Sequence, residues 1–240
     1  MTVSRTRTKL WGVPTKRDKD GVRGGETCEL RGKILQASVE LIEEEGLAKL
    51  SMREVARRAG VTHQAPYHHF EDREAILGEI AADGFRILTE RVESAVSEAG
   101  SEANVVARLR EMGRAYVEFA CRHPAHFRIM FRPELANPAR CPNARAAGDA
   151  AFSTLSRVVH SAVQAGLPAL PSEEALATML WSLAHGLAGL ILDGPLANKH
   201  PERGPSKPID DVLGALAVML EASVRCGAAA NAVKPGSGER

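Results

Sequence analysis

The sequence lacks paired cysteines, long apolar runs and a recognisable export signal. Its four cysteines, at positions 28, 121, 141 and 226, are far apart and form no Cys-x-x-Cys motif. Because no export signal is found, a reduced chain in the cytoplasm is the simplest interpretation. No apolar stretch reaches the roughly eighteen residues that cross a bilayer without polar interruption, so we expect no membrane partner.

The sequence also lacks the motifs that mark common enzyme sites. It has no Gly-x-Ser-x-Gly elbow, phosphate-binding loop, His-Glu-x-x-His helix or pair of carboxylates at a suitable spacing. His63, His68 and His69 lack the i, i+4 spacing of a helical zinc site, and no cysteine or acid completes one. We therefore expect neither an enzyme, nor a cofactor, nor a metal site.

Net charge is small, at +1, which gives little support for nucleic-acid binding when the whole chain is considered. The first 25 residues differ, because they hold seven Lys or Arg against two Asp. We interpret residues 1–28 as a disordered basic arm that could release counterions from DNA or reach an adjacent groove. An extension without function is an equal alternative.

Residues 51–70 have the layout of a helix, a tight turn and a second short helix. Ser51 and Glu54 form the pattern of a capping box. Small and apolar residues then repeat at helical spacing and predict one buried stripe: Met52, Val55, Ala56 and Ala59. Gly60 can adopt a positive φ at the turn, and Thr62 can cap the next helix. This is the pattern of a helix-turn-helix, whose second helix lies in the DNA major groove. An ordinary antiparallel helix pair is the alternative.

The flanking segments are also helical. Upstream, apolar residues share one face: Leu30, Ile34, Ala37 and Leu41. Gly46 ends that helix after three glutamates, whose charge opposes the helix dipole, so we expect this end to fray. Glu71-Asp72-Arg73-Glu74 opens a longer helix that continues to about residue 97. Pro66 falls about four residues into the predicted second helix, where the loss of one donor is tolerable.

Residues 29–90 resemble the DNA-binding domain of the TetR family of bacterial regulators. The resemblance rests on Ile34-Leu35-Gln36-Ala37, Leu41-Ile42, Gly46, Ser51-Met52-Arg53-Glu54-Val55-Ala56, Ala59-Gly60-Val61, Tyr67-His68-His69-Phe70 and Arg73. Pro66 departs from the branched aliphatic residue that most members have there. The resemblance implies a helix-turn-helix domain, over residues 29–75, that works as half of a dimer on double-stranded DNA with a palindromic operator.

The resemblance also implies contacts to the DNA backbone. Tyr67 would donate to a phosphate, and Arg73 would contact the backbone from the following helix. Ser51, at a helix N-terminus, offers its hydroxyl and unpaired amides to another phosphate. These contacts set affinity and register rather than sequence.

Base contacts are expected at the start of the second helix. His63 and Gln64 would read base edges, and a Gln pairs well with adenine. Thr62 and His68 are further candidates on this side, and Arg53 could reach either a phosphate or a guanine.

Residues 102–226 show helical periodicity throughout and no alternating strand pattern. The pattern predicts a helix ending at His123-Pro124, a short aromatic helix after it, and a loop over 132–145. Further helices are predicted at 148–165, from a Ser172 cap to about Leu192, and at 209–225. We assign residues 76–227 to a helical ligand-binding and dimerisation domain, and residues 228–240 to a disordered tail.

A second resemblance lies within this domain. Trp181-Ser182-Leu183-Ala184-His185-Gly186, with Tyr116-Val117-Glu118-Phe119-Ala120 and His123-Pro124, is similar to the WHG C-terminal domain of some TetR-family regulators. It supports a regulatory role and names no ligand.

Ligand sites in helical proteins form between helices, so we expect a pocket for a moderately hydrophobic molecule. The candidates, each of which could instead be plain core, are Met112, Tyr116, Phe119, Phe127, Met130, Phe131, Trp181 and His185. Trp181 and His185 are four residues apart, so they share a helical face and could offer one indole donor and one imidazole.

Small residues form a flat stripe on the helix after Ser172: Ser182, Gly186 and Gly189. Glycine weakens a helix, so glycines in its interior call for a packing reason. We predict that this helix and the 209–225 helix pair with their symmetry mates in a four-helix homodimer interface. Intramolecular core packing is the alternative.

Together these patterns predict an all-α transcription regulator, in which a three-helix helix-turn-helix domain joins a helical ligand-binding and dimerisation domain. The leading hypothesis is a cytoplasmic, ligand-responsive dimeric repressor that a small, moderately hydrophobic effector releases from its operator. A transcriptional activator or a ligand-independent DNA-binding protein is the closest alternative. An interaction scaffold would leave Tyr67, Arg73 and the capped turn unexplained.

Overall fold

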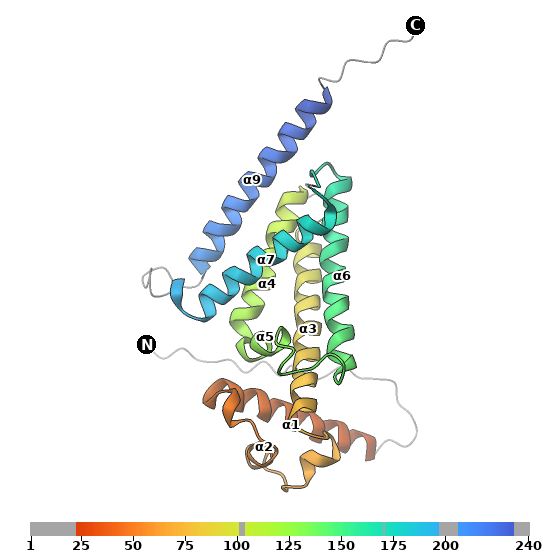
Figure 1. Cartoon of the computed structure of the whole chain (residues 1–240), viewed down its shortest axis with the longest axis vertical. Coiled ribbons are helices and arrows are strands. Elements are labelled where there is room, and N and C mark those ends of the chain that lie inside the picture. The colour runs from red at the N-terminus through yellow and green to blue at the C-terminus, as the bar shows by residue number, and fades with distance from the viewer. Residues whose placement is uncertain (1–22, 101–103, 170, 197–205, 233–240) are drawn as a thin grey trace. The chain divides into compact units, whose positions relative to one another are not determined.

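A computed structural model describes residues 23–100, 104–169, 171–196 and 206–232 (Figure 1). Within these ranges the chain forms eight α-helices, two 3-10 helices and no strand, which confirms the all-α class. The chain divides into two compact units, residues 1–76 and 77–240. Residues 1–22 of the predicted basic arm and residues 233–240 of the predicted tail lie outside the described residues.

The first unit contains α1 (Arg23–Glu45), a 3-10 helix η1 (Leu47–Lys49), α2 (Met52–Ala59), a 3-10 helix η2 (Ala65–His68) and the start of α3 (Arg73–Glu98). Its core contains Ile34, Leu41 and Val55, which have no exposed surface, and Phe70, which is buried. The Arg31 guanidinium lies 5.3 Å from the centre of the Phe70 ring. The predicted apolar stripes of α1 and α2 therefore face this core.

Two terminal boundaries differ from the sequence prediction. Helix α1 begins at Arg23 rather than at residue 29, because Gly24 and Gly25 weaken a helix by about 1 kcal/mol each and do not forbid it. Helix α9 (Ser206–Ala232) continues beyond residue 227 through an alanine-rich segment, and alanine is the strongest helix former.

The cap of α2 is half of the expected capping box. The Ser51 hydroxyl oxygen accepts a hydrogen bond from the Glu54 amide at 3.2 Å, as predicted. The Glu54 carboxylate does not return to Ser51 and instead accepts from Arg57 Nε at 2.9 Å. At the other end, Gly60 adopts φ 68°, and the next amide, from Val61, donates to the Ala56 carbonyl at 3.0 Å. This bond pattern turns the chain sharply out of α2.

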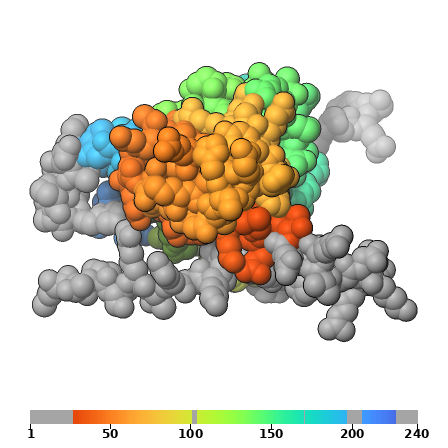
Figure 2. Space-filling view, turned by 90° about the horizontal axis from the view of Figure 1, so that it is seen from below, coloured from red at the N-terminus to blue at the C-terminus, as the bar shows by residue number. Residues whose placement is uncertain are grey.

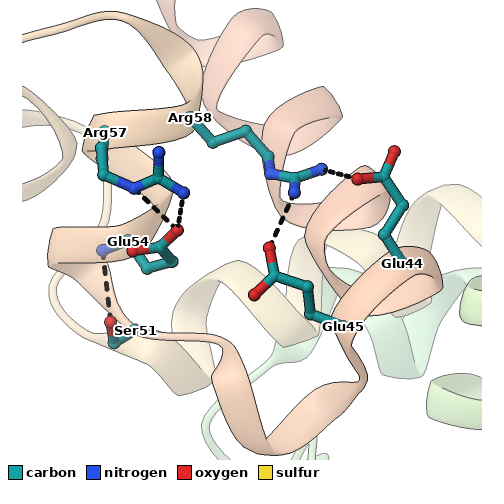
Figure 3. A network of polar contacts seen from close by, with 6 residues as sticks. All are labelled: Glu44, Glu45, Ser51, Glu54, Arg57 and Arg58. Atoms are coloured by element: carbon teal, nitrogen blue, oxygen red, sulfur yellow. Dashed lines mark hydrogen bonds and ion pairs between the residues drawn. The ribbon is translucent and has the colours of Figure 1, made fainter.

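A cation from α2 holds the acidic end of α1 (Figure 3). The Arg58 guanidinium donates to Glu44 at 2.7 Å and to Glu45 at 2.9 Å, and its side chain is only 17% exposed. A cation at a helix C-terminus interacts favourably with the dipole. Arg58 therefore offsets the unfavourable position of these glutamates, which had led us to expect fraying.

The same substitution at two glycines of this unit is expected to change stability in opposite directions. Gly60→Ala places a side chain at φ 68° and should lower the free energy of unfolding by about 1 kcal/mol. Gly32→Ala, in the middle of α1 with nothing within 4 Å of the new Cβ, should raise it by about 0.5–1 kcal/mol. Denaturant unfolding of both variants measures the two effects. Equal shifts would contradict the conformational role of Gly60.

The second unit contains the rest of α3 with α4 (Val105–Arg122), α5 (Pro124–Met130), α6 (Pro142–Gln164), α7 (Glu173–Leu192) and α9. Helix α4 packs against α5, α6, α7 and α9, and α6 also packs against α7 (Figure 1). Helix α4 buries one side in this core, and Val117 and Phe119 are among its most enclosed residues. The predicted Ser172 cap of α7 is confirmed by a bond from the Ala175 amide at 3.1 Å.

The predicted loop over 132–145 is too long at its C-terminal end. Helix α6 begins at Pro142, inside the range predicted as a loop. Proline suits the first helical position, because the amide it lacks would have no partner there and its φ is already helical. Helix α9 likewise begins three residues earlier than expected, at Ser206.

Candidate functional site

The second helix of the helix-turn-helix is the four-residue 3-10 helix η2, which begins later than predicted. Its N-cap residue is Gln64, no side chain caps it, and Pro66 is its second residue rather than its fourth. The expected cap by Thr62 is therefore wrong. Pro66 has no amide to donate to the Thr62 carbonyl, so the chain closes with i to i+3 bonds from Ala65 to Thr62 and from Tyr67 to Gln64.

This segment has a buried side and an exposed side. Ala65 and Pro66 are buried and anchor it. The exposed residues, which we call the reading row, are Thr62, His63, Gln64, Tyr67 and His68. Their side chains make no hydrogen bond or ion pair with any described residue, so their polar atoms are available to a partner. Figure 2 looks onto this unit, in which residues 50–75 are orange.

Within the reading row, two aromatic rings are in contact. The His63 and Tyr67 rings lie 5.9 Å apart between centroids, and Tyr67 is 48% exposed. His69, in contrast, is half-buried, and its ring centroid lies 6.5 Å from that of Phe70. Adjacent histidines in the sequence therefore occupy different environments.

The three arginines of α2 are not equivalent. Arg57 pairs with Glu54, and Arg58 pairs with Glu44 and Glu45 (Figure 3). Arg53 is exposed and has no ion pair within the described chain. Of these three cations, Arg53 is therefore the one left for an external anion.

Ser51 and Arg73 also differ in how far their polar atoms are free to bind an external partner. The Ser51 hydroxyl is exposed and uses its oxygen to accept from the Glu54 amide, so its hydrogen can be donated to a phosphate. Arg73 is half-buried: its Nη2 donates to the Leu47 carbonyl at 2.9 Å, and its Nε is buried without a partner. The structure thus gives Arg73 a contact that holds η1 to the start of α3, in addition to the DNA contact predicted for it.

The second unit contains a partly open cavity of about 340 Å³ between α3, α4, α6, α7 and α9. Four of the eight predicted ligand residues line it: Met112, Tyr116, Phe131 and Trp181. The other four are not among the lining residues: Phe119, Phe127, Met130 and His185. Helical spacing places these residues in the core, but it does not tell which core residues face an unfilled space.

Sequence reasoning missed the walls that come from α3 and α6. Phe85, Leu88 and Val92 line the cavity from α3, and Phe152 and Leu155 line it from α6. The only signal for these walls was the i, i+4 spacing of Leu88 and Val92, within the helix that we predicted to continue to about residue 97. Phe152 is 41% exposed and lies edge-on to Trp181 at 6.0 Å.

Three polar side chains meet at Tyr116. The Trp181 indole donates to the Tyr116 hydroxyl oxygen at 3.2 Å, and that oxygen lies 2.8 Å from His185 Nδ1. The indole and imidazole that we expected to be free for a ligand are therefore both engaged by Tyr116. Burial raises the pKa of the Tyr116 hydroxyl and lowers the pKa of His185, so all three groups are neutral at neutral pH.

Comparisons with known proteins support both units. The family model described as bacterial regulatory proteins of the tetR family matches residues 34–80. The family model described as a tetracyclin repressor-like C-terminal domain matches residues 109–222, which include the Trp181–Gly186 motif.

Individual relatives are similar over different lengths. The transcriptional repressor KstR2 of Mycobacterium tuberculosis is 27% identical over 118 residues, which are 49% of this chain and 57% of that protein. A solved protein of unknown function from Rhodococcus sp. RHA1 is 32% identical, with a TM-score of 0.65 over 83% of this chain and 95% of the other. The TetR family regulator PfmR from Thermus thermophilus is 20% identical, with a TM-score of 0.58 over 78% and 96% of the two chains, which shows a shared fold. The matches to the first curated relatives span 26% to 57% of their lengths.

Proposed function

The chain belongs to the TetR family of bacterial transcriptional regulators, and we propose that it is a dimeric repressor released from its operator by a small effector. Like the proteins that its two matched families describe, it is a DNA-binding regulator and not an enzyme. The alternative is a transcriptional activator or a regulator that needs no ligand.

The observation that carries the proposal is the reading row. Five exposed side chains with no internal hydrogen bond stand on one short segment that two buried residues anchor. In our proposal, His63 and Gln64 read base edges, with Thr62 and His68 beside them. Tyr67, Ser51 and Arg53 bind phosphates, and Arg73 positions the start of α3 and contacts the backbone from there.

We propose that a second copy of the chain covers α7 and α9. Four large apolar side chains are exposed there: Met179, Leu190, Val218 and Met219. Helix α7 is the one described helix that is long and apolar enough to cross a membrane by length and composition, and a third of its most apolar window is buried. We interpret its apolar surface as a dimer interface, because a helix-turn-helix reads a palindromic operator as two half-sites about 34 Å apart.

The cavity is the proposed effector site. Its walls are mostly Leu, Val, Met and Phe, which suits a moderately hydrophobic molecule. An effector that favours a dimer arrangement unsuited to the half-sites would shift the population away from DNA. Repression is proposed by analogy with KstR2, whose name describes a repressor, and a cytoplasmic location follows from the proposed access to chromosomal DNA.

The test has two steps. DNA bound by the chain is selected from genomic fragments, and release from the selected operator is then measured against a metabolite library. We expect at least one moderately hydrophobic compound to weaken operator binding about tenfold or more, and a reporter on that operator to rise when the chain is deleted. A reporter that falls on deletion would identify an activator. Compounds that bind the cavity and leave operator affinity unchanged would contradict effector release.

A further inference from the structure

The polar side chains that line the cavity determine which kinds of ligand it can bind. Five polar side chains occur among the described lining residues: Thr89, Tyr116, Asp149, Thr154 and Trp181. No Lys, Arg or His is among those residues, and the single charged group is the Asp149 carboxylate. An anionic ligand therefore meets no cation in these walls.

Every side-chain donor in the described lining is already used. The Trp181 indole donates to Tyr116, the Thr89 hydroxyl donates to the Phe85 carbonyl at 2.9 Å, and the Thr154 hydroxyl donates to Glu93 at 3.3 Å. The Asp149 carboxylate has no hydrogen to donate. Its nearest cation is Arg145 Nε at 4.0 Å, and both side chains are largely exposed.

The Tyr116 hydroxyl completes the set. It accepts from Trp181 and lies 2.8 Å from His185 Nδ1. If His185 were the donor, the hydroxyl hydrogen would be left without a partner in a buried, apolar place, at a cost of about 1–3 kcal/mol. When Tyr116 instead donates to Nδ1, both the indole hydrogen of Trp181 and the hydroxyl hydrogen of Tyr116 have a partner. One lone pair of the hydroxyl oxygen remains.

The walls therefore offer acceptors and no free side-chain donor. We propose that the cavity selects an apolar molecule that carries a hydrogen-bond donor, such as an alcohol or a phenol, and rejects carboxylates, ethers and carbonyl compounds of the same shape. Tyr116 is the acceptor at the buried end, since it is 8% exposed, and Asp149 is an acceptor at an exposed position. This inference rests on the proposed effector role of the cavity and names the class of effector.

The size of the cavity limits the ligand as well. A volume of 340 Å³ equals that of about eleven waters in the liquid, at roughly 30 Å³ each. A bicyclic aromatic body is of the right order. Naphthol, its methyl ether and the naphthoate anion, all substituted at the same ring position, therefore serve as probes that differ in hydrogen-bond donation and charge.

The test is calorimetric titration of the full chain with these three probes, in the absence of DNA. We expect naphthol to bind about tenfold more tightly than the methyl ether, and naphthoate to bind more weakly than naphthol by at least the same factor. The double variant Tyr116→Phe/His185→Phe removes the hydroxyl acceptor and the imidazole nitrogen that could replace it, and it frees the indole hydrogen of Trp181, so the ether should now bind more tightly than naphthol. Trp181→Phe removes the donor and keeps the acceptor, so the preference for naphthol should remain. Ser223→Ala removes a hydroxyl of α9 outside the cavity lining and is the matched control, with the wild-type preference expected.

The inversion in Tyr116→Phe/His185→Phe separates recognition from packing, because a merely structural role would weaken the binding of all three probes alike. The inference is overturned if the wild-type chain prefers the ether or the anion, or binds no naphthol. It is also overturned if the folded double variant Tyr116→Phe/His185→Phe keeps the preference for naphthol, or if folded Trp181→Phe loses it. None of these results bears on DNA binding, which is measured separately on the operator, so the proposed regulator function can stand where this inference fails.

Discussion

Arg53→Ala is expected to weaken operator binding by at least about a hundredfold. The substitution removes one exposed guanidinium from each chain, and a dimer on two half-sites loses it twice. Each charge-assisted contact to a phosphate contributes several-fold to tenfold or more in affinity, so the paired loss multiplies. Because the first helix of a helix-turn-helix crosses the DNA backbone, we assign Arg53 to a phosphate rather than to a guanine.

The salt dependence distinguishes these two assignments. Loss of two phosphate contacts should reduce the slope of log affinity against log salt by about two. Arg57→Ala is the matched control, because the Arg57 guanidinium already pairs with Glu54 on the same helix. It should change the slope less than Arg53→Ala does. An unchanged slope with relaxed sequence preference would move Arg53 to a base contact, and an unchanged affinity would remove it from the interface.

Gly186→Leu is expected to convert the proposed dimer into a monomer and thereby to reduce operator affinity by about a thousandfold or more. A Cβ at Gly186 meets nothing within 4 Å in the isolated chain, and the same is true of Gly189. The larger side chain therefore fits the single chain, and it also raises helix propensity by about 1 kcal/mol. In the proposed interface the same side chain occupies the space that the partner's helix needs, and a monomer engages only one half-site.

Sedimentation velocity measures the change in mass, and circular dichroism shows whether helix content is kept. Gly32→Leu is the matched control, since Gly32 is also an open glycine of a helix but lies in the first unit. We expect it to remain dimeric. A Gly186→Leu variant that stays dimeric at micromolar concentration would place the dimer interface elsewhere on the chain.

Local signals predicted the first unit well. Ser51 and Gly60 make their bonds to residues three or four positions away, and the apolar residues of α2 are equally close in sequence. The sequence therefore contains both members of each local interaction. The 3-10 form of η2 was missed, although Pro66 was seen, because the position of a proline matters only once the start of the helix is known. Similarly, Pro142 was interpreted as a loop residue when it begins α6.

Contacts between distant residues were the limit of sequence reasoning. The periodicity of α2 does not show that Arg58 pairs with acids 13 and 14 residues away. Because Arg57 is paired as well, Arg53 is the one cation of α2 without an ion pair among the described residues. The cavity was predicted in the correct domain, but only the packed structure separates Met112, which lines it, from Phe119, which fills the core. The pairing of Tyr116 with both Trp181 and His185 was missed for the same reason.

The central claim is that two reading rows, fixed in one dimer, bind two half-sites together. The most direct measurement is the affinity of the wild-type chain for its selected operator, compared with the same DNA lengthened between the half-sites by half a helical turn, about five base pairs. We predict a loss of at least about a hundredfold, because the insertion rotates one half-site to the opposite face of the duplex. Equal affinity for the two DNAs would contradict the account.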